Sequence, residues 1–153
     1  MKKLVLGIFL LLGMYSLEAQ TRSRDVGIYM MGNAHKIVEF GNENPIYTFY
    51  YQNGKYQNIT DIRYTRIGDV DDLKKFIYDC DSLLNTIELG VGENIYDVEV
   101  GIVKCSVSKM FNQPMLFITS DDELGYGLMS RAVIKRFKKS LIINGIEVVG
   151  YNK

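Results

Sequence analysis

The feature that most constrains the fold of this chain is an alternating aromatic segment, "IYTFYYQ", at residues 46–52. In an extended strand, successive side chains point to opposite faces, so Tyr47, Phe49 and Tyr51 share one face. A row of rings this large needs a buried surface to pack against. We therefore expect these three side chains to line the core face of a sheet.

A hairpin signal, Asn53-Gly54, follows this strand directly. A type I′ turn needs positive φ at both central residues, and this dipeptide supplies it most readily. We expect a return strand over residues 55–59, continuing through 61–67. Because Tyr50 lies on the opposite face from the buried row, it would be exposed if helices cover only one side of the sheet.

Two amphipathic helices are expected further along the chain. The first begins at Asp69, whose carboxylate can cap free amide groups. Its apolar stripe recurs at spacings of three and four, and consists of Val70, Leu73, Phe76, Ile77, Cys80, Leu83, Leu84 and Ile87. The second is expected to begin at Ser120, which forms a capping-box pattern with Glu123. Its apolar face would be Leu124, Leu128, Met129, Val133, Phe137 and Leu141.

Alternating segments at 25–31, 35–40, 96–111 and 115–119 predict further strands. The phase of the alternation changes near Gly101, which suggests a β-bulge there. Asn144-Gly145 suggests a short final hairpin. The connections between consecutive strands are too short for parallel crossovers. We therefore expect an α+β fold: an antiparallel sheet with two helices packed on one face, a two-layer sandwich.

The N-terminal segment, residues 1–19, has the order of a secretory signal peptide: two lysines, an apolar run, then a small residue. We expect cleavage between Ala19 and Gln20, leaving residues 20–153 as one α+β domain. The apolar run is shorter than the roughly 20 residues that a spanning helix needs. This predicts a secreted or periplasmic bacterial protein with no transmembrane span after cleavage.

The charge balance argues against a nucleic-acid partner, because 18 basic and 18 acidic side chains cancel. One region is locally basic, the second half of the second expected helix. Arg131, Lys135 and Lys138 are its candidate contacts with an anionic partner. The alternative is a solvated helix face whose cations complement the negative end of the helix dipole.

The chain holds two cysteines, Cys80 and Cys105, both on apolar faces of their segments. Export would permit a disulfide between them. Buried free thiols that pack as small hydrophobic side chains are the alternative. Spacing alone does not decide between these two states.

Catalytic residue patterns are sparse. His35 is the only histidine, and no flanking motif marks it as a base, so we interpret it as a surface or strand-end residue. The cysteines and carboxylates lack metal-ligand spacing, so neither a metal site nor a cofactor is predicted. Acidic clusters at residues 69–72 and 121–123 fall at expected helix starts, where capping explains them.

These patterns favour a non-enzymatic binding protein whose partner is another protein or an envelope component. Recognition is expected on the open sheet face and the aromatic hairpin, through Tyr50, Tyr56 and Tyr64, because exposed tyrosines suit such contacts. Two alternatives remain open. One is a small carboxylate-dependent hydrolase with His35 as a base. The other is a structural homo-oligomer subunit that pairs exposed edge strands.

Overall fold

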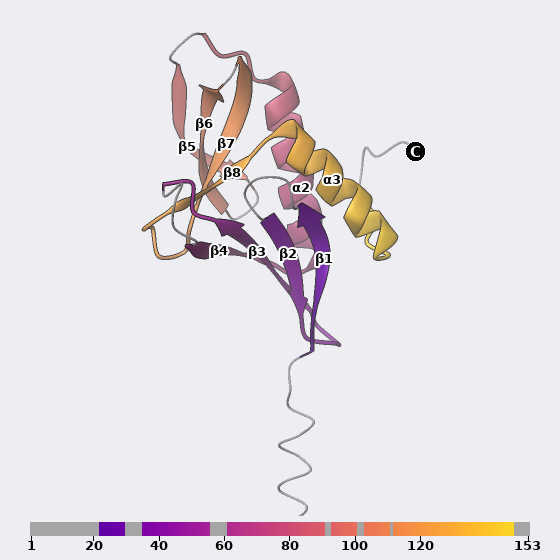
Figure 1. The fold of residues 1–153 in the computed structure, drawn as a ribbon. Helices are drawn as coiled ribbons and strands as arrows, with labels where there is room; N and C mark the ends of the chain where they lie inside the picture. The colour runs from indigo at the N-terminus through magenta and orange to yellow at the C-terminus, as the bar shows by residue number, and fades with distance from the viewer. Residues whose placement is uncertain are drawn as a thin grey trace, which may run out of the picture.

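The computed structural model describes residues 22–29, 35–55, 61–90, 93–100, 103–110 and 112–148. In this part of the chain, four strands and a helix are followed by four more strands and a helix (Figure 1). The first half comprises β1 (Ser23–Tyr29), β2 (His35–Phe40), β3 (Ile46–Gln52), β4 (Ile62–Gly68) and α2 (Val70–Thr86). The second half comprises β5 (Asn94–Val100), β6 (Val103–Met110), β7 (Gln113–Thr119), β8 (Tyr126–Met129) and α3 (Arg131–Ile143).

The strands form two antiparallel sheets, each with its four strands in chain order. The expected α+β class is confirmed, but the strands do not form the expected single sheet. β4 pairs with β3, whereas β5 pairs with β6, so the chain passes from the first sheet to the second through α2. The same ββββα order occurs twice without an evident sequence repeat.

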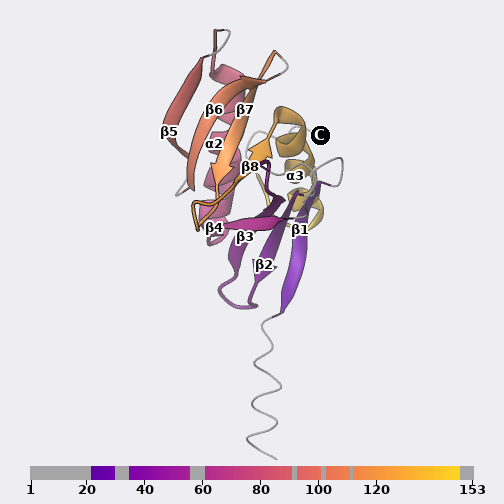
Figure 2. The same cartoon turned by 60° about the vertical axis from the view of Figure 1, so that its left-hand side comes forward.

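Both helices pack on the same face of the first sheet (Figures 1 and 2). The fully buried ring of Phe49 lies 6.3 Å from the ring of Phe76 in α2 and 5.8 Å from that of Phe137 in α3, between centroids. Tyr47 and Tyr51 are buried beside Phe49, as the alternation predicts. Buried side chains of both sheets and both helices form one continuous core.

The first helix is confirmed in position and cap. Asp69 accepts hydrogen bonds from the backbone amides of Asp71 and Asp72, and the Asp72 carboxylate accepts from the amide of Asp69. This reciprocal capping satisfies amides that the first helical turn leaves without partners. Neither described helix is long and apolar enough to cross a membrane.

The second helix begins about ten residues later than expected. Ser130 caps α3, while residues 120–125 form a tight turn and 126–129 form β8. The Ser120 hydroxyl bonds within its own turn instead of capping a helix. Gly127 lies against the ring of Tyr51, a close approach that favours the strand. The final hairpin is also wrong, because Asn144 caps the end of α3 and Gly145 (φ +81°) terminates it.

The Asn53-Gly54 pair does not close a two-residue hairpin. Gln52 pairs with Ile62, so the connection between β3 and β4 is longer than a tight turn. Gly54 instead donates its amide to the carbonyl of Tyr126 in β8, at 2.9 Å. Of the expected return strand at 55–59, Lys55 lies in a turn and residues 56–59 fall outside the described residues, whereas the continuation is observed as β4.

The change of alternation near Gly101 has a different cause from the one expected. Val100 pairs with Val103, so β5 and β6 are separate antiparallel strands, and reversal of the chain between them shifts the phase. Gly101 itself lies outside the described residues. The register irregularity in this pair falls between Ile95 and Val98.

Polar contacts join the two sheets where β4 meets the turn at 120–125. The guanidinium of Arg63 contacts the carboxylates of Asp61 and Asp122. The Thr65 hydroxyl donates to the carbonyl of Thr119 at 2.7 Å. Because these bonds connect both halves of the chain, the turn is held against the first sheet.

Replacing Phe49 with Ala should lower the free energy of unfolding by about 3–5 kcal/mol, because it leaves a cavity between the sheet and both helices. Denaturant titration followed by far-UV circular dichroism measures this change. Tyr78→Ala, at a half-exposed ring on α2, is the matched control and should stay within about 0.5 kcal/mol of wild type. Equal effects of the two variants would contradict the central position of Phe49.

Replacing Gly127 with Ala should destabilise the protein by about 1–3 kcal/mol through overpacking. The added Cβ would lie 2.6 Å from Cγ of Tyr51, a buried ring with no space to move. Gly90→Ala is the control, because its added Cβ would meet only the flexible carboxylate of Glu93 at 3.1 Å or more. Thermal unfolding of both variants measures the difference, and an unchanged melting temperature for Gly127→Ala would contradict this packing.

Candidate binding surface on the first sheet

Three rings form a row across the face of the first sheet that lies opposite the helices. Tyr50 pairs with Tyr64 across β3 and β4, with ring centroids 5.8 Å apart. On its other side, Tyr50 lies 6.4 Å from the ring of Phe40 in β2. We call Phe40, Tyr50 and Tyr64 the aromatic row. Sequence alternation predicted Tyr50 on the outer face and made the position of Tyr64 beside it conditional on the strand register, whereas it did not single out Phe40.

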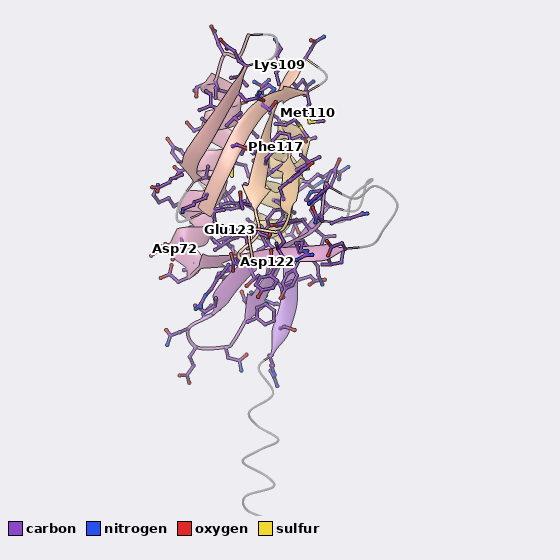
Figure 3. The ribbon with its side chains drawn as sticks, turned by 90° about the vertical axis from the view of Figure 1, so that its left-hand side faces the viewer. Asp72, Lys109, Met110, Phe117, Asp122 and Glu123 are labelled. Atoms are coloured by element: carbon purple, nitrogen blue, oxygen red, sulfur yellow. The ribbon has the colours of Figure 1, made fainter. Side chains whose placement is uncertain are left out.

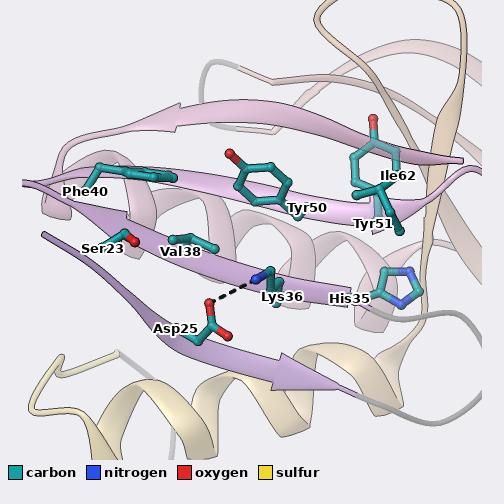
Figure 4. A pocket seen from close by; sticks show the side chains of 9 residues that line it. All are labelled: Ser23, Asp25, His35, Lys36, Val38, Phe40, Tyr50, Tyr51 and Ile62. Atoms are coloured by element: carbon teal, nitrogen blue, oxygen red, sulfur yellow. Dashed lines mark hydrogen bonds and ion pairs between the residues drawn. The ribbon is translucent and has the colours of Figure 1, made fainter. Parts of the chain in front are cut away.

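A groove of about 520 Å³ runs along this face (Figure 4). Val38 of β2 is buried, and its partners on the adjacent strands are Asp25 and Thr48. Its side chain lines the groove between Asp25 of β1 and Tyr50 of β3, as Figure 4 shows. The residues that line the groove are Ser23, Asp25, His35, Lys36, Val38, Phe40, Tyr50, Tyr51 and Ile62.

Large apolar side chains are exposed around the groove. Ile28 is 44% exposed, Ile62 is 50% exposed and Tyr64 is 52% exposed. Single exposed apolar residues are common on protein surfaces. Here three of them share one sheet face with the groove, and clustered apolar exposure marks interaction sites.

One ion pair stands beside the groove. The ammonium group of Lys36 lies 3.2 Å from the carboxylate of Asp25 and 5.9 Å from the ring centroid of Tyr50. Both charged side chains are more than two-fifths exposed, so their pairing contributes at most about 1 kcal/mol. The pair gives this mainly apolar surface two charged groups. A partner that binds here can break the pair at little cost in free energy.

Two other predicted contact residues, Arg131 and Lys135, are on α3 and not on this face. Tyr56 lies outside the described residues. Arg131 donates from Nε to the carbonyl of Leu84, at 2.8 Å, and so satisfies the end of α2. Lys135 is exposed on α3.

Lys138 requires a correction, because it does not belong to a solvent-facing basic patch. Its side chain is buried, and its ammonium group lies 2.5 Å from the carboxylate of Asp81 in α2. A buried charge needs such a partner to offset its lost hydration. Lys138 therefore joins the two helices and is not available to an anionic ligand.

The two cysteines are free thiols in this structure, and both are buried. The Sγ atom of Cys105 donates to the carbonyl of Val98 at 3.3 Å. Burial raises the pKa of the Cys105 thiol to about 12 and that of Cys80 well above its usual value. Since the thiolate is the reactive form, neither cysteine has the character of a nucleophile.

His35 is at the start of β2, but it is buried and not on the surface. Its ring stacks on Phe49 with centroids 5.8 Å apart and an interplanar angle of 16°. Tyr29 contacts the same imidazole edge-on at 6.0 Å. Among the described residues, no group of three or more His, Cys, Asp or Glu side chains could hold a metal ion.

A second aromatic pair and a rigid turn were missed by sequence reasoning. Phe117 in β7 and Tyr126 in β8 have ring centroids 5.2 Å apart on the second sheet. Leu124 is 63% exposed at the turn between these strands. The sequence assigned residues 120–129 to a helix, and therefore placed Leu124 on a buried face.

Comparison of this chain with protein-family models, with curated proteins and with solved structures finds no match.

The carboxylates of Asp61 and Asp122, which both contact Arg63, should make the protein less stable in acid. The Asn53 amide and then Arg63 lower the pKa of Asp61, and the Ser120 hydroxyl and then the Leu124 amide lower the pKa of Asp122. Their stabilising effect is present above the unfolded Asp pKa of about 3.9. It is lost as pH falls through the lower folded values.

Asp122→Asn should therefore be less stable than wild type at pH 7, and the two proteins should converge as pH falls below about 4. Urea denaturation between pH 2 and 7 measures both curves. Curves that remain parallel throughout this range would contradict a role for the Asp122 carboxylate in acid stability.

Proposed function

We propose that this chain is an exported, non-enzymatic binding protein that recognises another protein or an envelope component. The contact surface is the outer face of the first sheet, with the aromatic row at its centre. The observation that carries this proposal is the cluster of exposed apolar side chains around a groove on the face that the helices do not cover.

The chemistry of this face suits protein recognition. Tyr50 and Tyr64 combine apolar rings with hydroxyl groups, and tyrosine supplies large contact area with few rotatable bonds. The Tyr50 ring already packs against Phe40 and Tyr64, so it loses little side-chain freedom when a partner binds. Export is supported by the signal-peptide pattern of residues 1–19, and it implies a secreted or periplasmic location.

The combined variant Tyr50→Ala and Tyr64→Ala tests this function. It should lose at least tenfold in affinity for a partner captured from envelope extract, identified by mass spectrometry and then purified, because aromatic anchors carry much of the energy of an interface. Titration calorimetry with that purified partner measures the loss. The variant should remain folded, since Tyr64 is exposed and Tyr50 is only partly buried.

Tyr78→Ala is the matched control, because Tyr78 is 51% exposed on α2, away from this face. It should bind the same partner as wild type does. Unchanged affinity for Tyr50→Ala and Tyr64→Ala, in a variant with native circular dichroism, would remove the aromatic row as the binding surface.

A further inference from the structure

A second hollow, of about 410 Å³, lies on the second sheet, and Phe117 in β7 and Tyr126 in β8 line it. Phe117 alternates with the buried side chains of Leu116 and Ile118. Its ring therefore projects from the face of the sheet that the core does not use. Figure 3 shows Phe117 on this face, with Glu123 below it where the two sheets meet.

The two rings lie close together, and the backbone fixes one of them. Their centroids are 5.2 Å apart and their planes are inclined at 53°. The amide of Gly54 donates to the carbonyl of Tyr126, and a Cβ at Gly54 would lie 2.5 Å from the ring of Tyr126, so this ring packs directly on the glycine. An ammonium group is attracted to an aromatic ring within about 6 Å of its centroid. A single cation in the hollow can therefore lie within that range of both rings.

Glu123 adds a carboxylate to the lining of this hollow. The other two acids of the same turn have partners, since Asp121 accepts from the amide of Arg66 and Asp122 from the amide of Leu124. The Glu123 side chain makes no hydrogen bond or ion pair with any residue that the structure describes. Its backbone is left-handed, with φ of +58°, a conformation that is uncommon outside glycine and occurs at ligand sites. The turn thus places an unpaired negative charge beside two rings.

Acidic side chains outnumber basic ones around this turn, which gives the region a negative formal charge that attracts cations. The acids are Asp61, Asp121, Asp122 and Glu123, and the bases are Lys55, Arg63 and Arg66.

We propose that this hollow binds a small organic cation with an alkylated ammonium group. Its alkyl groups contact Phe117, Tyr126 and the exposed Leu124, while the ring faces and the Glu123 carboxylate attract its positive charge. The volume of the hollow is in the range of small-molecule sites. Lys55 also lines the hollow, and its charge opposes a cation. The site is separate from the aromatic row, so this inference does not rest on the proposed function.

Two probes of the same shape test the proposal on the full chain purified from cells that export it. Choline carries a trimethylammonium group, and in its isostere dimethylbutanol a neutral carbon atom replaces the nitrogen. At constant ionic strength, choline should bind about three- to tenfold more tightly than the neutral isostere, because only the cation gains from the rings. Shifts of the backbone amide NMR signals of Phe117, Gly125 and Tyr126 measure both affinities and locate the site.

Substitutions of single side chains should change the affinity for choline in opposite directions. Glu123→Gln should weaken choline binding about two- to fivefold, because it removes a partly solvated attraction, and should leave the binding of dimethylbutanol unchanged. Lys55→Gln should strengthen choline binding, because it removes a like charge from the lining. Glu43→Gln is the matched control, because Glu43 is exposed in the segment between β2 and β3, and it should bind choline as wild type does.

Equal affinity for the two probes would overturn the proposal, since the hollow would then be an apolar site without preference for charge. Absence of any response to choline across the millimolar range would overturn it as well. Binding to phosphatidylcholine vesicles without a response to free choline would assign the ammonium group to a lipid surface, and would also contradict a small soluble ligand. The combined variant Tyr50→Ala and Tyr64→Ala should bind choline as wild type does, which separates this test from that of the proposed function.

Discussion

The contact of Phe49 with both helices determines the organisation of the whole molecule. Its ring, in the centre of β3, lies within 6.3 Å of Phe76 in α2 and of Phe137 in α3, measured between centroids. One side chain can contact both helices only if they lie on the same face of the sheet. The opposite face is therefore left to the aromatic row, whose rings contact each other instead of the core. This division explains why β3 carries rings on both faces and why only one set is buried.

Hydrogen bonds and an ion pair hold the turn at 120–125 against β4, at the edge of the first sheet. Arg63, the backbone of Tyr64 and Thr65 on β4 all bond to residues 119–122 of the second half. Gly54 bonds to β8 from the other side of the junction. The turn that carries Leu124 is therefore held against the edge of the first sheet.

Sequence patterns predicted helices and strands correctly where no tertiary contact opposed the local signal. The segment at 70–86 combines a capping carboxylate with an uninterrupted apolar stripe, and α2 follows it closely. The segment at 120–129 has a capping pattern and apolar spacing too, but it forms a turn and β8. There the packing of Gly127 against Tyr51, a contact between residues 76 positions apart, outweighed the local helix signal. Lys138 shows the same limit, because its burial depends on Asp81 in another helix.

By itself, the sequence determined the alternation that buries Tyr47, Phe49 and Tyr51, the extent of α2 and the antiparallel α+β class, because these depend on side-chain period and on short connections. It also placed Tyr50 on the outer face, whereas the pairing of Tyr64 with Tyr50 depends on the strand register seen in the structure. The division of the strands into two sheets, the burial of Lys138 and the exposure of Leu124 at the turn between β7 and β8 emerge only in the tertiary structure. Those features arise from contacts between segments that are far apart in the chain. A local sequence pattern does not reveal such contacts or their energies.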